Sequence, residues 1–238
     1  MKDINKAIEY EKEYQSSRVK GEYPFHLVDK IKECGFESVQ EYYELKKTHQ
    51  FEQLNFEYIE TNPRDCLKDV FKVMALGKTC FLFADTDETF VFNGDANYNQ
   101  DYCLNHNIPI YPIQTSGGTI VSSNGDLSFG VCCPKANGID RNYVLNGLKD
   151  VLQKYTANIV TVDSNDILVG GKKVIGSASY CQNNVFMFVC HISFCDNTDL
   201  ISNICISKKV GKPVGYIDFM TRKEFKEEVS EWLLTNSI

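Results

Sequence analysis

The sequence predicts an α+β fold, with mixed or antiparallel sheets and flanking helices, and two observations lead to this prediction. First, strand-like apolar runs such as TCFLFAD and NNVFMFVCHISF alternate with amphipathic helical segments from about residue 55 onward. Second, the 238-residue chain is 43% hydrophobic, which is enough for a sizeable core and argues against wholesale disorder. We find no internal repeats.

Residues 1–52 differ in composition from the rest of the chain and are predicted to form a small helical appendage. They are rich in Glu, Lys, Gln and Tyr, and Leu27 and Ile31 have helical spacing within HLVDKIKECGF. Gly35 separates this helix from a second one in ESVQEYYELKKTHQFEQL. The charged residues are interpreted as a solvated helix face. Residues 53–238 are expected to form the second domain.

The second domain begins with a predicted helix in TNPRDCLKDVFKVMAL, where Pro63 lies in the first turn. Strands in TCFLFAD and ETFVFN, a helix in NQDYCLNHN and a strand after Pro109 follow. The runs GGTIVSS and LSFGVCC are expected to pair as a hairpin, because Asn124–Gly125 between them is a strong hairpin signal.

The later elements are predicted from periodicity and capping. RNYVLNGLKDVLQKY is amphipathic, with Val144, Leu148 and Leu152 on one face. Two or three strands are expected in NIVTVDSNDILVGGKKVIGSASY, and another in NNVFMFVCHISF. The last helix, TRKEFKEEVSEWLL, opens with a capping box of Thr221 and Glu224.

Charge and composition exclude several classes of function. The formal net charge of −7 argues against nucleic acid or an anionic membrane as the main partner, since both attract basic surfaces. No apolar run approaches the roughly 18 residues of a membrane span, and the charged start lacks a signal-peptide core, so a cytoplasmic protein is expected. The ten cysteines include no C-x-x-C pair, which favours small buried thiols over a zinc site.

Three segments carry the candidate chemistry. They are TSGGTIVSSNGDLSF, SNDILVGGKKVIGSA and HISFCDNTDL, in that order along the chain. Alone, Lys172 and Lys173 beside a glycine turn indicate only a surface hairpin. Together, the three segments resemble motifs of the lipoate–protein ligase family, in the biotin and lipoate protein ligase superfamily. The resemblance covers roughly residues 55–210, and its middle motif is the most specific.

The resemblance implies a biotin/lipoate ligase-like catalytic domain that activates lipoate, or a related small acyl acid, with ATP. The acyl-adenylate then passes its acyl group to a lysine of a lipoyl-carrier domain. Lys173 matches the family's lysine and is assigned an electrostatic catalytic role. Asp166 is expected near both nucleotide and magnesium. The residues assigned to ligand binding are Gln114, Ser116, Gly117, Gly118, Asn165, Asp166, Gly171, Gly176, Ser177, Ala178 and His191. An apolar tunnel for the acyl tail is assigned to Val121, Phe129 and Val174.

Simpler roles exist for several of these residues. Gly117 and Gly118 are compatible with a plain strand bend. His191 lies in an apolar strand, which favours a hydrogen-bonded core histidine over a catalytic base. Asn197 and Asp199 are compatible with capping a short helix near Thr198.

The sequence differs from the family's motifs at the positions expected to bind phosphate. Ile113 and Gln114 stand where the family has an arginine pair, and no Lys or Arg occurs between Thr79 and Pro134. Arginine is hard to replace in bidentate phosphate binding, so adenylate formation is open to question.

Two alternatives therefore stay open. One is an acyltransferase that takes octanoyl or lipoyl groups from an acyl carrier protein through a cysteine thioester, with Cys132, Cys133 or Cys181 as nucleophile; Cys205 lacks the Pro-Cys-Gly setting of such enzymes. The other is a non-catalytic member of the fold that binds an acyl ligand or its carrier. An acidic carrier would need a basic strip, for which the candidates are Lys135, Arg141, Lys172, Lys173, Lys208 and Lys209.

Overall fold

The computed structural model describes residues 2–17, 25–52, 57–61, 79–93, 98–112, 119–135, 139–182, 184–206 and 212–235. The described residues fall into two compact units, the first ending at Glu52 and the second running from Glu57 to Thr235. Among the described residues, no helix is both long enough and apolar enough to cross a membrane.

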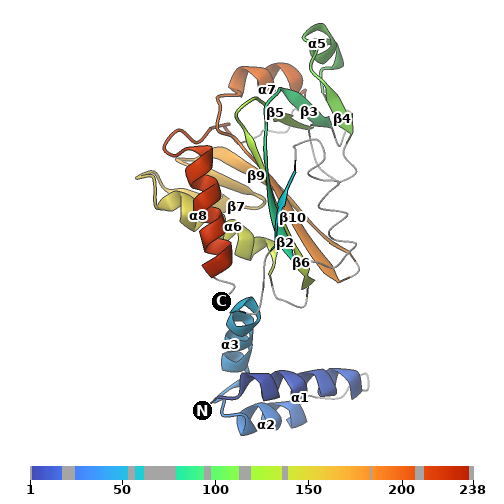
Figure 1. Ribbon diagram of the computed structural model, residues 1–238, viewed down its shortest axis with the longest axis vertical. Helices are drawn as coiled ribbons and strands as arrows, with labels where there is room; N and C mark the ends of the chain where they lie inside the picture. The colour runs from blue at the N-terminus through green and yellow to red at the C-terminus, as the bar shows by residue number, and fades with distance from the viewer. Residues whose placement is uncertain are drawn as a thin grey trace. The chain divides into compact units, whose positions relative to one another are not determined.

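The described residues of the first unit form three helices, one more than the sequence pattern indicated: α1 (Ile4–Ser17), α2 (Phe25–Glu33) and α3 (Val39–Glu52) (Figure 1). Gly35 has φ +90° and separates α2 from α3, as predicted. Helix α1 was missed although Ile4, Ala7 and Ile8 have helical spacing, because the charged Glu11 follows on the same face. The helices enclose a small core of Ala7, Leu27, Ile31, Cys34, Phe36 and Tyr42.

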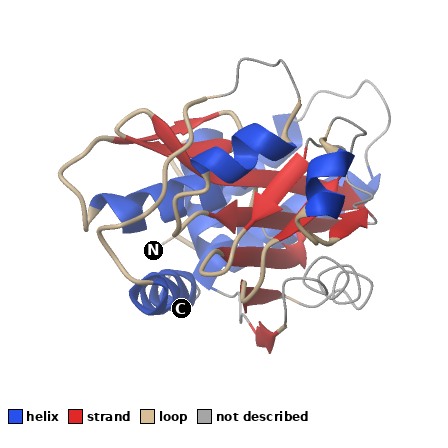
Figure 2. Ribbon diagram, turned by 90° about the horizontal axis from the view of Figure 1, so that it is seen from above, coloured by secondary structure: helices blue, strands red, loops and turns tan. Residues whose placement is uncertain are grey.

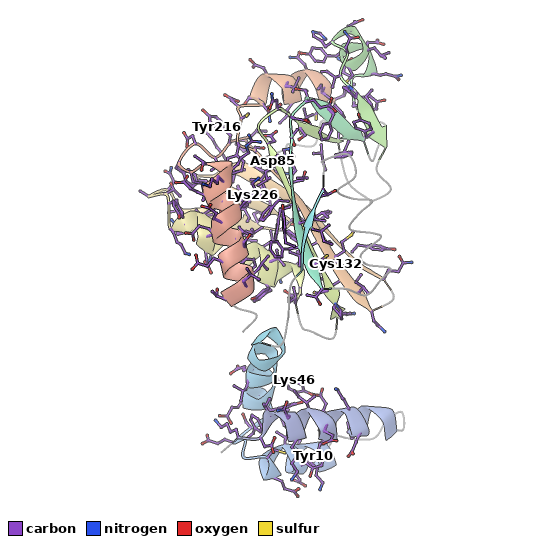
Figure 3. The ribbon with its side chains drawn as sticks, in the orientation of Figure 1. Tyr10, Lys46, Asp85, Cys132, Tyr216 and Lys226 are labelled. Carbon is purple, nitrogen blue, oxygen red and sulfur yellow. The ribbon has the colours of Figure 1, made fainter. Side chains whose placement is uncertain are left out.

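One charged residue of this unit is not solvated, contrary to the expectation for its helix face. Glu11 is buried in α1 and accepts hydrogen bonds from Lys46 Nζ and Tyr42 Oη, both at 2.5 Å (Lys46 is labelled in Figure 3). Burial raises the pKa of Glu11, but the hydrogen bonds from Lys46 and Tyr42 outweigh it and hold the pKa below its ordinary value. The charged pattern of α1 therefore conceals an internal ion pair.

The described residues of the second unit form two sheets. The larger has seven strands in the order β1-β2-β6-β10-β9-β8-β7, antiparallel except for the β1–β2 pair, and the smaller has the order β4-β3-β5. The strands are β1 (Glu57–Glu60), β2 (Cys80–Asp85), β3 (Phe90–Asn93), β4 (Ile110–Pro112), β5 (Thr119–Ser122), β6 (Leu127–Pro134), β7 (Val160–Asp163), β8 (Asp166–Val169), β9 (Lys172–Gln182) and β10 (Val185–Ile192). The α+β prediction is confirmed. The helix expected from TNPRDCLKDVFKVMAL lies outside the described residues, apart from Thr61 at its start.

The predicted hairpin at Asn124–Gly125 is wrong. A turn forms there, with φ +103° at Gly125, but β5 pairs with β3 in the small sheet, whereas β6 pairs with β2 and β10 in the large one. The reason is that the turn is bonded to a different segment: Gly125 N–H donates to Thr86 O at 2.8 Å and Thr86 N–H donates to Asp126 O at 2.9 Å. The turn therefore passes the chain from one sheet to the other.

Helices α6 (Arg141–Gln153) and α8 (Arg222–Thr235) pack against each other, and α6 also packs on β7 and β8 (Figures 1 and 2). The predicted apolar face of α6 is confirmed, because Val144, Leu148 and Leu152 are fully buried. The capping box of α8 is confirmed too, with reciprocal hydrogen bonds between Thr221 and Glu224. The short helices α5 (Gln100–Asn105) and α7 (Thr198–Ile204) contact each other beside the small sheet.

Gly147 makes the α6–α8 contact possible. A Cβ atom at this position would lie 1.9 Å from Cζ2 of Trp232, the only tryptophan of the chain. We therefore expect Gly147→Ala to destabilise the protein by about 1–3 kcal/mol through overpacking, although alanine is the better helix former. Urea unfolding followed by tryptophan fluorescence measures this. Asn146→Ala, at an exposed position of the same helix, is the control and should change stability by less than about 0.5 kcal/mol. Equal stability of the two variants would contradict the close packing.

Candidate functional site

The β8–β9 hairpin carries the candidate lysine. Gly170 and Gly171 connect the two strands, with φ +57° and +79°. Positive φ at both central residues is what a two-residue hairpin turn requires, and glycine adopts it at low cost. The turn leads directly into Lys172 and Lys173, at the start of β9. Gly171 therefore serves as a turn residue in this structure.

A β-bulge follows the turn. Leu168 pairs with Lys173, but Ile167 pairs with Ile175, so β9 contains one extra residue, Val174. Residues three apart on a regular strand point to opposite faces, and one extra residue reverses that relation. The bulge therefore places the side chain of Lys173 on the same face as position 176.

Gly176 provides the space that the lysine occupies. A Cβ atom at Gly176 would lie 2.8 Å from both Cε and Nζ of Lys173. The lysine chain thus crosses directly over the glycine, and its ammonium reaches Asp166 Oδ1 at 2.9 Å. The side chain of Lys173 remains 40% exposed, so its charge is accessible to a ligand.

The second oxygen of Asp166 binds another lysine, which the sequence analysis missed. Lys212 Nζ lies 2.8 Å from Asp166 Oδ2 and 3.0 Å from Asp163 Oδ2, and it donates to Asp163 O at 2.8 Å. Partial burial lowers the pKa of Lys212, but the hydrogen bonds with Asp166 and Asp163 outweigh it and raise the pKa above the ordinary value. Lys212 lies in GKPVGY, which has no motif or periodicity that singles it out.

The arrangement around Asp166 does not fit a protein-bound magnesium ion. Both oxygens of this carboxylate are in ion pairs with lysine ammonium groups. The described part of the chain also contains no group of three or more His, Cys, Asp or Glu side chains able to hold a metal. Magnesium prefers several oxygen ligands that are free of competing cations.

Asn165 joins the hairpin to helix α6. Its backbone carbonyl accepts hydrogen bonds from Ser177 N–H at 2.9 Å and Ser177 Oγ at 2.7 Å, and its Oδ1 accepts one from Arg141 Nη1 at 2.6 Å. Arg141 Nε is buried with no hydrogen-bond partner among the described residues. Ala178 is half-buried next to Ser177 on β9.

A cavity of about 330 Å³ opens beyond Ala178. It is lined by Asp140, Arg141, Asn142, Ser179, Tyr180, Cys181 and Phe186. Arg141, which donates to Asn165, thus connects that residue with the cavity.

His191 lies beside Gly176, its partner across β9 and β10. Side chains of such partners project to the same face, so His191 shares a face with the ammonium of Lys173. His191 Nε2 lies 3.1 Å from Ser122 Oγ and 3.3 Å from Asp126 Oδ2. It is a partly buried, hydrogen-bonded histidine, in line with the simpler role that we considered for it.

The carboxylate of Asp126 is fully buried. It accepts hydrogen bonds from Ser123 N–H at 2.8 Å, Phe194 N–H at 3.0 Å and Asn197 Nδ2 at 2.7 Å. Burial raises the pKa of Asp126, but the interaction with His191 and these hydrogen bonds outweigh it and hold the pKa below its ordinary value.

One capping expectation is wrong as a result. Asn197 stands at the N-cap of α7, but its side chain makes no capping hydrogen bond. Instead, Asn197 Oδ1 accepts from Ser123 Oγ, and its amide donates to Asp126. The oxygen that would accept from the helix N–H groups is therefore used by Ser123, and the charged acceptor Asp126 holds the amide nitrogen in place.

Several predicted residues lie outside the described part of the chain: Gln114, Ser116, Gly117, Gly118, Lys208 and Lys209. The structure brings Lys173, Asp166, Gly176 and His191 onto one region of the β8–β9–β10 surface. The proposed tunnel residues Val121, Phe129 and Val174 are all buried. Val121 packs in the small-sheet core, whereas Phe129 stacks on Phe83 in the large sheet.

The three candidate nucleophilic cysteines differ in access. Cys132 is fully buried, and a hydrogen bond from Cys80 lowers the pKa of its thiol although burial raises it. Burial raises the pKa of Cys133 to about 12, which keeps this thiol protonated. Cys181 is exposed and lines the cavity beside Arg141.

Two basic side chains of α8 lie close to Asp85, within the interval between Thr79 and Pro134 that contains no Lys or Arg. Arg222 Nη1 lies 3.2 Å from Asp85 Oδ1, and Lys226 Nζ lies 2.5 Å from Asp85 Oδ2 (Figure 3). A second cavity, of about 600 Å³, opens here and is also lined by Thr86, Asp87, Asn124, Thr221 and Lys223.

A family model described as the lipoyl protein ligase A/B catalytic domain matches residues 80–231, which is more than half of the chain. The chain belongs to this family. The match runs from β2 to α8 and includes Lys173, Asp166, Gly176, His191 and Lys212. No curated protein matches the chain.

Solved structures agree with this lipoyl protein ligase fold. LipL1 of P. falciparum, in complex with lipoate, has a TM-score of 0.65 at 12% identity over 75% of this chain, which spans only 61% of that chain. A bi-partite lipoate protein ligase from Thermoplasma acidophilum, described with its E2 lipoyl domain, has a TM-score of 0.62 at 16% identity, covering 77% and 84% of the two chains. Lipoate-protein ligase A bound with ATP gives 0.59 at 15% identity, with the same coverages of 77% and 84%.

The depressed pKa of Asp126 gives a testable pH dependence. Its contribution to stability is fully present above the unfolded-state pKa of about 3.9 and is lost as the pH falls through the folded-state pKa. We expect Asp126→Asn to cost about 3 kcal/mol at pH 7, because the amide cannot accept all the hydrogen bonds and leaves His191 without its carboxylate. In urea unfolding, this deficit should stay constant down to about pH 5 and narrow below about pH 4.

Asp140→Asn is the matched control for this experiment. Asp140 caps α6 by accepting from Tyr143 N–H, and asparagine caps equally well, so little change is expected. An Asp126→Asn protein as stable as this control at pH 7 would rule out the central role of Asp126.

Proposed function

We propose that the protein attaches lipoate, or a related acyl group such as octanoate, to a lysine of a carrier protein through an acyl-adenylate. In the first step, a carboxylate oxygen of the acid attacks the α-phosphorus of ATP, and pyrophosphate leaves. In the second, the ε-amino group of the carrier lysine attacks the acyl carbonyl, and AMP leaves. The first step builds negative charge on the α-phosphate oxygens and the leaving pyrophosphate. The second builds it on the acyl carbonyl oxygen and the leaving AMP, and the attacking amine releases a proton.

Lys173 is the residue on which this proposal rests. Its ammonium stands on a fixed hairpin, crosses Gly176 and is held at 2.9 Å from Asp166, yet the side chain stays 40% exposed. A preorganised cation of this kind stabilises developing negative charge without reorganisation. It lies in the segment where the sequence resembles the family's lysine motif.

The ligands and partner of the proposal follow relatives of the same fold. One of them binds lipoate and another binds ATP, and a third is described with its E2 lipoyl domain. We accordingly propose lipoate and ATP as substrates and a lipoyl-carrier domain as the acceptor. Magnesium would accompany ATP as its counterion, and no protein ligand is assigned to it, because Asp166 is engaged by two lysines.

The thioester route has less support. Cys132 and Cys133 are fully buried, and the raised pKa of Cys133 opposes its ionisation. Cys181 is the accessible one of the three and lines the cavity beside Ala178. An acyl-enzyme that hydroxylamine removes and that Cys181→Ser abolishes would favour this route over adenylation.

We expect Lys173→Ala to lower acyl-adenylate formation by about 10²- to 10³-fold, the usual effect of removing one preorganised electrostatic group. The measurement is mass spectrometry of lipoyl-AMP formed from lipoate, ATP and magnesium, with thermal melting as the check on folding. Lys172→Ala, at the exposed neighbouring position, is the control and should retain nearly full activity. Undiminished adenylation in Lys173→Ala would contradict the catalytic role assigned to Lys173.

Gly176→Ala tests the position of the lysine independently of its charge. The added methyl group would clash with the flexible end of Lys173 and make only an ordinary contact, at 3.7 Å, with Asp166 Oδ1. The stability should therefore change by less than about 1 kcal/mol while the ammonium is displaced. Because small misplacements at a reacting centre are costly, we expect a loss of activity of about 10²-fold. Steady-state kinetics with urea unfolding measures both quantities, and full activity in this variant would contradict the proposed geometry.

A further inference from the structure

Three oxygen atoms converge on the ammonium of Lys212. They are Asp163 Oδ2 at 3.0 Å, Asp163 O at 2.8 Å and Asp166 Oδ2 at 2.8 Å. Two carboxylates and a backbone carbonyl are ligands typical of a hard divalent cation. In this protein the cation that these three oxygens bind is the ammonium group of Lys212.

The two lysines at Asp166 are not equivalent. The side chain of Lys212 is 28% exposed and also faces Asp163, whereas that of Lys173 is 40% exposed and binds a single oxygen. Two carboxylates face the two ammonium groups: Asp163 binds Lys212 alone, whereas Asp166 binds both lysines. The charge of Asp166 is shared with the more enclosed Lys212, which leaves part of the positive charge of Lys173 for an anionic ligand.

The backbone fixes Lys212 relative to Lys173. Lys173 N–H donates to Pro213 O at 2.7 Å, and Gly215 N–H donates to Lys173 O at 2.9 Å. Pro213 and Gly215 belong to the segment of residues 212–217, in which Figure 3 labels Tyr216. At the end of this segment, Ile217 N–H donates to Ser193 O at 2.8 Å. The segment therefore lies along β9, and its backbone hydrogen bonds hold Lys212 close to Asp166.

We propose that Lys212 is a positioning residue of the site, and that its ammonium takes the place beside Asp163 and Asp166 that a divalent cation would otherwise occupy. It acts through Asp166, by neutralising this carboxylate so that Lys173 retains charge for the substrate. The kinetic consequence rests on the proposed adenylation, whereas the consequence for metal binding does not.

The metal-binding test uses Mn²⁺ and the full chain, without nucleotide. Lys212→Met removes the cation that these three oxygens share and leaves only Lys173, at the other oxygen of Asp166. We therefore expect Mn²⁺ affinity, measured by water-proton relaxation, to rise at least about tenfold above that of the wild type. Adding Asp166→Asn to this variant should abolish the gain. Lys154→Met, which removes the partner of Glu228 on another surface, is the matched control and should not gain affinity. If Lys212→Met does not fold, Lys212→Gln tests the same charge.

The kinetic test measures acyl-adenylate formation as a function of ATP concentration. We expect Lys212→Met to raise KM for ATP by about 10- to 100-fold with a smaller change in kcat, and Lys212→Arg to restore most of the affinity. Excess Mn²⁺ should partly rescue Lys212→Met, since it fills the vacated place. A merely structural lysine would not produce this rescue.

The outcomes separate the two proposals. If the wild type forms no acyl-adenylate but Lys212→Met gains Asp166-dependent Mn²⁺ binding, the proposed function fails and the role of Lys212 stands. If the wild type already binds Mn²⁺ as tightly as the variant, and Asp166→Asn abolishes that binding, Lys212 does not hold the cation position and the inference is overturned. An active Lys212→Met enzyme with an unchanged KM for ATP would also overturn it.

Discussion

The buried carboxylate of Asp126 is the interaction on which the site-bearing unit depends. It lies at the turn where the chain leaves the small sheet for the large one, and it accepts from Ser123 on one side and from Phe194 and Asn197 on the other. A buried charge is tolerated only when such donors surround it, so these segments have little freedom to separate. The same carboxylate meets His191, which ties the end of β10 to the junction between the sheets.

This constraint extends to the lysine through the sheet. Strand β10 pairs with β9 so that His191 faces Gly176, and the bulged β8–β9 hairpin then carries Lys173 back over Gly176. On the outer side, the backbone of Pro213–Gly215 bonds to Lys173. The backbone of Lys173 is therefore fixed by hydrogen bonds to Pro213 and Gly215 on one side and by the pairing of β9 with β8 on the other, and only the end of its side chain depends on the ion pair with Asp166. Such support is what a preorganised electrostatic group needs.

Sequence patterns predicted the features that local chemistry determines. The Gly170–Gly171 turn, the capping box of α8 and the apolar face of α6 each depend on residues close together in the chain, and each is present. The hairpin at Asn124–Gly125 failed because that signal specifies a turn and not the strands that pair beyond it. Asp126 and Lys212 were missed for a related reason: one buried aspartate and one lysine carry no spacing signal, and their roles arise only from segments about 40 to 70 residues away.

The loss of a sequence motif is not the same as the loss of charge in space. The interval without Lys or Arg, between Thr79 and Pro134, suggested a site unable to hold a phosphate. The fold brings cations from the C-terminal part of the chain instead: Lys212 to Asp166, and Arg222 and Lys226 to Asp85. A phosphate responds to the positions of charges, whatever their order in the sequence. For the proposed adenylation, the deciding physical question is therefore how the charge of Asp166 is shared between Lys173 and Lys212.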